Sequence, residues 1–319
     1  MQVWDIADGG LRATIIDWGA RLARLQVATP TGWREVTLGP ATLAGFRDDP
    51  AHMGAIAGRY ANRIGQGRFR LDGKDYTLPT NDRGNCLHGG LVGFGNLAWQ
   101  GEADSNSVTL RHTSPDGDQG FPGTLQVEIC YRLADNGISI TYAAATDAPT
   151  VLNLTNHAYF NLSGADDVLE HELTLHAAHF TPSEPSGLPT GEIRPVAGTN
   201  FDFRTPVAIG ARIQADDEQL HLGQGYDHNF VLGMAPFAAP ILAAEVTAGG
   251  LRMEVWTTEP AIQLYTGNHL ARAGFQKFQA FCLEAQHFPN SPNQPSFPTT
   301  VLRPGEAFRS ETKYIFNTN

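Results

Sequence analysis

The stretch VLNLTNHAYFNLSG, from Val151 to Gly164, alternates between two kinds of side chain. One set is apolar apart from Asn156 and consists of Leu152, Leu154, Ala158, Phe160 and Leu162. The other set is polar but uncharged and consists of Asn153, Thr155, His157, Tyr159 and Asn161. A period of two predicts a half-buried β-strand. A solvent-facing strand would carry Lys, Glu or Arg, so this polar face, on which His157 and Tyr159 point the same way, indicates a binding surface.

Two later segments share this design. In AIQLYTG (261–267), one face carries Gln263 and Tyr265 and the other carries Ile262 and Leu264. In FCLEAQHF (281–288), the polar face carries Cys282, Glu284 and Gln286, and the apolar face carries Phe281, Leu283 and Ala285. Amides and phenols both donate and accept hydrogen bonds, which suits a ligand rich in hydroxyl groups. A tyrosine ring can also lie against the C–H face of a sugar. The alternative for any one strand is a hydrogen-bonded network in the core.

Alternation recurs along the rest of the chain, while helical periodicity is scarce. The 34 glycines and 20 prolines indicate many turns, and LDGKDY (71–76) and ADNGIS (134–139) have hairpin spacing. Only segments 42–46 and 206–214 are candidates for short helices. We therefore predict an all-β protein, a large antiparallel β-sandwich. No change in composition marks a boundary, so a single domain over residues 1–319 is expected.

Composition excludes several classes of partner. The formal charge is −11 and no cluster of Lys and Arg is visible, which argues against nucleic acid or an anionic membrane. Cys86, Cys130 and Cys282 are far apart, as in proteins of a reducing compartment. The N-terminus lacks signal-peptide character, and the apolar run 230–244 contains two prolines and is shorter than the roughly 20 residues of a membrane span. We expect a soluble, cytoplasmic protein, in which the sequons at Asn153 and Asn161 stay unmodified.

His157 and Glu284 are the candidates for acid–base chemistry. Glu284 is flanked by Leu283 and Ala285, and burial there would raise its pKa toward the range of a general base. The alternatives are a carboxylate held in a buried ion pair and a structural histidine. HELTLHAAHF (171–180) spaces two histidines five apart on a strand-like pattern, where a zinc helix needs four, so no metal site is predicted.

Two further segments remain open at this point. Arg59 and Arg63 in GRYANRIGQG (58–67) could belong to a turn or contact an anion. The proline-rich segment 288–300 could be a polyproline ligand, but it directly follows a strand, so a rigid loop bordering a site is favoured.

Several motifs together resemble one family, the aldose 1-epimerases, also called galactose mutarotases. They occur in family order and cover most of the chain: GRYANRI (58–64), LHGG (87–90), NHAYFNLSG (156–164), GYDHNFVL (225–232), QLYTGN (263–268) and LEAQHFPNSPNQPSFPTTVLRPGE (283–306). The resemblance implies a β-supersandwich fold. It also implies interconversion of the α and β anomers of hexoses such as galactose and glucose, without a cofactor or a metal.

Matched motif by motif, the resemblance implies that Glu284 is the general base and His157 the general acid. The implied sugar-binding residues are Asn62, Arg63, His88, Tyr159, Asp227 and Gln263. A base that takes the proton of the C1 hydroxyl and an acid that protonates the ring oxygen would open the ring. The C1–C2 bond would then rotate and the ring would close on its other face, and Arg63 and His88 could stabilise charge on oxygen.

The chain departs from the family pattern in GFGNLAW (93–99), where Gly95 and Asn96 replace an acidic and a basic residue. Three alternative functions stay open. A hexose-6-phosphate mutarotase would need a basic pocket for phosphate, and Arg59 and Arg63 are the candidates. A sugar-binding module would have no use for a matched acid and base. A glycoside hydrolase would need a second carboxylate, for which Asp227 is the only contender. The expected partner is an aldohexose, and the expected assembly is a monomer or a homodimer.

Overall fold

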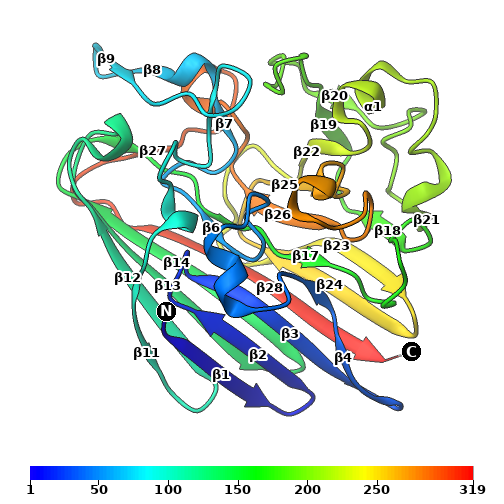
Figure 1. The fold of residues 1–319 in the computed structure, drawn as a ribbon. Helices are drawn as coiled ribbons and strands as arrows, with labels where there is room; N and C mark the ends of the chain where they lie inside the picture. Colours follow the sequence, from blue (N-terminus) through cyan, green and yellow to red (C-terminus); the bar gives the residue numbers. More distant parts are fainter. Residues whose placement is uncertain (319) are drawn as a thin grey trace.

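The computed structural model describes residues 1–318 and is built almost wholly of antiparallel strands (Figure 1). The largest sheet has nine strands, whose long central members form the back of the molecule. In spatial order they are β11 (Gln100–Ala103), β12 (Ser107–Ser114), β13 (Leu125–Ala134), β14 (Gly137–Thr146), β28 (Phe308–Thr318), β24 (Leu251–Thr257), β23 (Ile241–Ala248), β18 (Glu172–Leu175) and β21 (Val207–Ala208).

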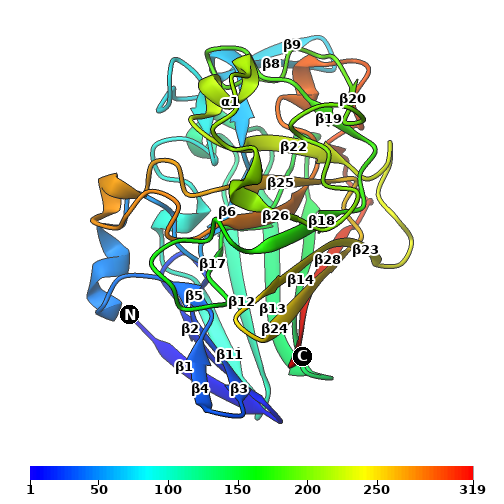
Figure 2. The same cartoon turned by 90° about the vertical axis from the view of Figure 1, so that its right-hand side faces the viewer.

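Two smaller sheets pack against this one. The first consists of β1 (Val3–Asp8), β2 (Leu11–Ile16), β3 (Arg21–Thr29) and β4 (Gly32–Glu35), and the second of β20 (Arg194–Pro195), β19 (His179–Thr181), β22 (Asp227–Val231), β25 (Ala261–Tyr265) and β26 (Cys282–Gln286). Tyr131 on β13 donates to the Ala20 carbonyl, and Tyr314 on β28 donates to the Leu283 carbonyl. One apolar core joins all three sheets, and Figure 2 shows the layers edge-on. The predicted antiparallel sandwich is confirmed.

Short strand pairs and helical turns complete the fold. The pairs are β10 (Cys86–Leu87) with β7 (Arg63–Ile64), β15 (Thr150–Val151) with β27 (Val301–Leu302), β16 (Thr155–Asn156) with β6 (Ile56–Ala57), β17 (Tyr159–Phe160) with β5 (Thr37–Leu38), and β8 (Arg68–Leu71) with β9 (Lys74–Thr77). The 3-10 turns are η1 (Leu43–Arg47), η2 (Gly65–Gly67), η3 (Phe94–Asn96), η4 (Asp118–Gly120), η5 (Ile209–Ala211), η6 (Leu270–Ala273) and η7 (Ser291–Asn293). Among the described residues no helix has the length and apolar character needed to cross a bilayer.

The opening stretch is not the single half-buried strand that its alternation predicts. It contains β15, β16 and β17, each two residues long and each paired with a different partner. Every residue from Val151 to Leu162 is buried. The stretch runs between the sheets, so protein covers both of its faces, and a period of two cannot distinguish that situation from one exposed face.

The predicted faces of β25 and β26 are confirmed. Ile262, Leu264 and Leu283 belong to the main core, and the polar residues stand on the opposite side. The antiparallel register places Gln263 opposite Glu284 and Tyr265 between Asp227 and Cys282. Side chains in register across neighbouring strands share a face, so residues from three segments of the chain meet there.

The predicted helices are short 3-10 turns, η1 and η5, and the one α-helix among the described residues was not predicted. It is α1 (Glu218–Gly223), which begins where the Asp217 carboxylate accepts from the Gln219 amide. Six residues are too few for a recognisable period. HELTLHAAHF forms β18 and β19, as its alternation indicates.

The proline-rich segment is a loop that contains η7. Asn290 donates from its backbone amide to the Arg63 carbonyl, and its side chain accepts from the Gly65 amide. The loop therefore supports the chain segment that carries Arg63.

Candidate active site

A polar pocket lies over the five-stranded sheet, and most of the predicted site residues line it. These are Asn62, Arg63, His88, His157, Tyr159, Asp227 and Glu284. Gln263 is outside this lining. It is buried behind Asp227, and its Nε2 donates to Asp227 Oδ1 at 2.7 Å. The structure thus brings all eight predicted residues together, with Gln263 in contact with a pocket residue and the other seven on the wall.

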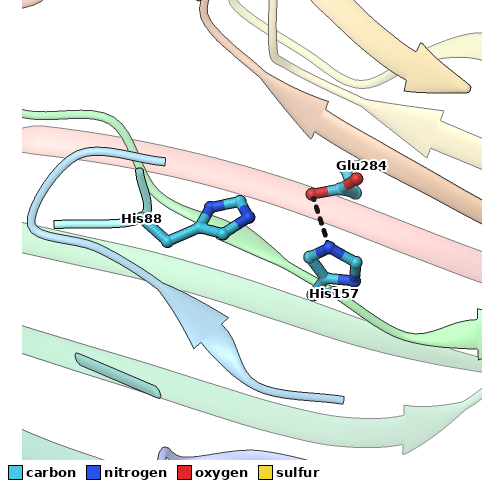
Figure 3. Close-up of side chains that lie close together, drawn as sticks. All are labelled: His88, His157 and Glu284. Carbon is cyan, nitrogen blue, oxygen red and sulfur yellow. Dashed lines mark ion pairs between the residues drawn. The ribbon is translucent and has the colours of Figure 1, made fainter. Parts of the chain in front are cut away.

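His157 and Glu284 face each other across the pocket floor (Figure 3). His157 Nε2 lies 3.7 Å from Glu284 Oε2, which is too long for a good hydrogen bond. Within residues 1–318, Glu284 Oε2 has no hydrogen-bond partner although the side chain is buried. Burial, reinforced by the Asp227 charge and opposed by Arg63, raises the pKa of Glu284 to about 8. An unpartnered carboxyl with a pKa near neutrality is suited to exchange a proton with a ligand.

The His157 imidazole is enclosed. Its ring stacks on Tyr159 with 5.0 Å between centroids, and its Nδ1 lies 3.5 Å from Cys282 Sγ. Burial, reinforced by His52, lowers the pKa of His157 to about 3. The imidazole is therefore neutral at ordinary pH and can act toward an oxygen ligand as a hydrogen-bond donor.

The backbone of Asn62 holds His88 in one orientation. The Asn62 amide donates to His88 Nδ1 at 3.1 Å, and the His88 amide donates to the Asn62 carbonyl at 3.0 Å. Because an amide can only donate, Nδ1 is the acceptor, so the neutral ring carries its proton on Nε2. Both residues have left-handed backbones, with φ of 60° and 50°, a conformation uncommon outside glycine. The next residue, Gly89, has to be glycine, because a Cβ at this position would lie 2.0 Å from the Gly58 carbonyl oxygen.

The two candidate arginines have different roles. Arg63 lines the pocket, where its Nε donates to Asp82 Oδ2 at 2.8 Å. Arg59 lies elsewhere, buried, and donates to the carbonyls of Pro122 and Gly123 and to the side chain of Ser114. Of the two alternatives left open for Arg59, an anion contact is excluded, because its guanidinium donates to carbonyls and a hydroxyl of the protein itself.

Several pocket residues were not predicted from the sequence. They are Pro50, Ala51, His52, Asp82, Arg83, Leu87, His269 and Arg272, together with Tyr265, which the alternation had placed on the polar face. Apart from Tyr265, which is on β25, these residues lie outside the main sheets, mostly on loops. A loop has no period, so nothing in its sequence indicates the direction of a side chain.

Three side-chain atoms, from His88, His157 and Glu284, lie within 4.8 Å of one another and have the chemistry of metal ligands. The contacts around them favour another use. The Asn62 amide keeps the His88 proton on Nε2, and burial favours a protonated Glu284. A metal needs lone pairs and a carboxylate, whereas this arrangement favours hydrogen bonds to ligand oxygens.

The Gly95–Asn96 departure lies close to the pocket. Gly95 is in η3, and its carbonyl accepts from Arg21 Nη2 at 3.0 Å. A Cβ at this position would lie 3.0 Å from the Ala55 Cβ and 3.8 Å from Nδ1 of His52, a pocket residue. A larger residue at 95 would therefore press on the side chain of Ala55, whose amide donates to the His52 carbonyl.

The fold and the pocket define an all-β protein of the supersandwich kind, in which a sheet face of amides and phenols surrounds a buried carboxyl and an imidazole. A family model described as aldose 1-epimerase matches residues 2–315. The chain belongs to the aldose 1-epimerase family.

Relatives with known names align with nearly the full length of this chain. A galactose mutarotase of Rattus norvegicus is 41% identical over 327 residues, with 99% of this chain and 94% of the relative covered. An aldose 1-epimerase of Escherichia coli is 41% identical over 323 residues, with 97% and 93% covered. Among solved structures, a GalM/aldose epimerase homologue from C. elegans superimposes with a TM-score of 0.91 at 31% identity, with 99% of each chain covered.

Proposed function

We propose that this protein interconverts the α and β anomers of aldohexoses such as galactose and glucose. The observation that carries the proposal is the unpartnered carboxyl of Glu284, which faces His157 Nε2 across a polar pocket. Its surroundings, which include Asn62, Tyr159 and Asp227, offer donors and acceptors for sugar hydroxyls. The identity of about 40% with galactose mutarotases and aldose 1-epimerases supports the same reaction.

In this reaction Glu284, as a carboxylate, takes the proton of the C1 hydroxyl. The bond between C1 and the ring oxygen breaks, and the ring oxygen takes the proton of His157 Nε2. The product is an open-chain aldehyde, with a neutral Glu284 and a negative charge on the imidazole. Rotation about C1–C2 presents the other face of the aldehyde, and reclosure returns both protons. A neutral imidazole can fill this role when its pKa is held low, as that of His157 is.

The remaining residues position the sugar and stabilise charge. His88 presents its Nε2 proton to the pocket. Arg63 donates to Asp82 through Nε, and the terminal nitrogens of its guanidinium are further donors. Donors held in place before the reaction stabilise developing negative charge on oxygen. Asp227, oriented by Gln263, accepts hydrogen bonds from sugar hydroxyls.

Polarimetry tests the proposal. Freshly dissolved α-D-galactose and α-D-glucose should reach equilibrium rotation faster with the protein than without it, after the spontaneous rate is subtracted. Sugar binding with no change in rate would indicate a binding module instead. Release of free sugar from a glycoside would indicate a hydrolase.

A phosphorylated hexose is the second candidate substrate, because the pocket rim is more basic than the sequence indicated. Arg83, His269 and Arg272 line it, and Arg83 and Arg272 are exposed. Guanidinium groups recognise phosphate. Comparing rates on glucose and glucose 6-phosphate separates the candidates: a preference for the free sugar supports the proposed substrate, and a preference for the phosphate would replace it.

A further inference from the structure

Cys282 stands directly behind the imidazole of His157, on the side away from Glu284. Its Sγ lies 3.5 Å from His157 Nδ1, within the range of a hydrogen bond that involves sulfur, while Nε2 of the same ring faces Glu284. The thiol is fully buried on β26 and does not line the pocket. Among the predicted site residues, the thiol contacts His157 and packs in one buried cluster with Tyr159.

The direction of this hydrogen bond depends on the tautomer of His157, and the surroundings bear on both. Burial holds the pKa of the Cys282 thiol well above its ordinary value, so sulfur keeps its proton. The backbone carbonyl of His157 accepts from the Gly54 amide at 2.9 Å and, through its second lone pair, is the competing partner for a proton on Nδ1. The Tyr159 hydroxyl donates to the Ala51 carbonyl. A protonated thiol has a hydrogen to donate, and His157 Nδ1 accepts it when the ring proton is on Nε2.

We propose that Cys282 is a positioning residue that keeps the proton of neutral His157 on Nε2 by donating its S–H to Nδ1. Nε2 is the atom that faces Glu284, so the proton is held where a sugar ring oxygen would receive it. His88 is held in the same tautomer by the Asn62 amide. Both imidazoles consequently present N–H groups to the pocket.

The donor on Nδ1 has a second effect, which rests on the proposed function. When Nε2 gives its proton to the ring oxygen, the imidazole becomes negative, and a donor at Nδ1 stabilises that charge. A carboxylate at Nδ1 has the opposite effect, since it stabilises imidazolium and makes histidine a base. A buried thiol in this place thus adapts His157 to the role of acid.

Nitrogen NMR of the sugar-free protein tests the tautomer without reference to turnover. With ¹⁵N-labelled histidine, and His157→Gln used to assign the signals, His157 should show a protonated Nε2 and an unprotonated Nδ1 near pH 7. A protonated Nδ1 would overturn the proposal. This result is independent of whether the protein is a mutarotase, which polarimetry of the wild type decides.

Matched substitutions test the effect on the reaction. Cys282→Ser keeps a donor, whereas Cys282→Val fills a similar volume without one. We expect Cys282→Val to lower kcat about 10–100-fold, the range found when a metal-bound histidine loses its outer hydrogen-bond partner. KM should be nearly unchanged, and Cys282→Ser should recover most of the loss. Cys130→Val, on β13, is the control for thiol removal. Equal kcat in Cys282→Val and wild type would overturn the proposal, as would an equal loss in the Val and Ser variants when both are folded.

Discussion

Residues 1–318 contain two buried pairs of glutamate and histidine, and the distance within the pair distinguishes them. In the pocket, Glu284 and His157 lie 3.7 Å apart, and Glu284 Oε2 has no partner among the described residues. Three residues further along the chain, His287 Nδ1 lies 2.6 Å from Glu259 Oε2 in a closed hydrogen bond. Both pairs have the same chemistry and similar burial. In the closed pair the imidazole and the carboxyl group hydrogen-bond to each other, whereas in the open pair Glu284 Oε2 and His157 Nε2 remain available to a ligand.

The closed pair is also tied to the opening stretch. Asn153 accepts from the His287 amide at 3.0 Å and donates from its side chain to the His287 carbonyl at 3.3 Å. A polar residue of VLNLTNHAYFNLSG therefore supports the structure beneath the pocket, while His157 of the same stretch faces the pocket. We infer that the closed pair stabilises the fold and the open pair performs the reaction.

The largest expected effect comes from the same substitution made in both pairs. Glu284→Gln removes the base, so we expect kcat for mutarotation to fall about 10²–10⁴-fold, the usual contribution of general acid–base catalysis. Glu259→Gln should leave kcat within a small factor of wild type. Polarimetry on folded samples measures both, and a wild-type rate in Glu284→Gln would exclude it as the base.

The second effect is on the pH dependence of kcat/KM. Glu284 acts as a carboxylate, and its pKa of about 8 means that the free protein holds the proton below that pH. His157, with a pKa of about 3, does not change charge in this range. We expect kcat/KM to fall about tenfold per pH unit below pH 8 and to level off above it. A flat profile between pH 5 and 8 would contradict the assigned base, and Glu259→Gln should keep the wild-type profile.

The smallest effects are on stability, and they have opposite signs. Because the pKa of Glu284 is higher when folded, the folded protein binds more protons between pH 4.5 and about 8, so its free energy of unfolding falls as pH rises through that range. Glu284→Gln should lack this decrease and exceed wild type in stability at pH 8. Glu259→Gln should lower the free energy of unfolding by about 1–3 kcal/mol, because it weakens a buried charged hydrogen bond. Urea unfolding at pH 5 and pH 8 measures both, and a less stable Glu284→Gln at pH 8 would contradict this account.

The sequence was most informative where the structure is regular. Ile262, Leu264 and Leu283 faced the core as alternation predicts, because β25 and β26 are ordinary neighbours in one sheet. Alternation failed over 151–164 because three short pairings and two covered faces replace one strand. Motif resemblance predicted seven residues that line the pocket. It could not show that Arg59 donates to backbone carbonyls, or that His52 reaches the pocket from a loop and Arg272 from η6.

Exchange between anomers at equilibrium tests the central claim most directly. In an equilibrated solution of galactose, magnetisation-transfer NMR measures the rate at which the H1 signals of the α and β anomers interconvert. We predict rapid exchange with the wild type and with Glu259→Gln, and only the spontaneous rate with Glu284→Gln. Exchange at the spontaneous rate with the wild type, or rapid exchange with folded Glu284→Gln, would contradict the claim that the open pair catalyses mutarotation.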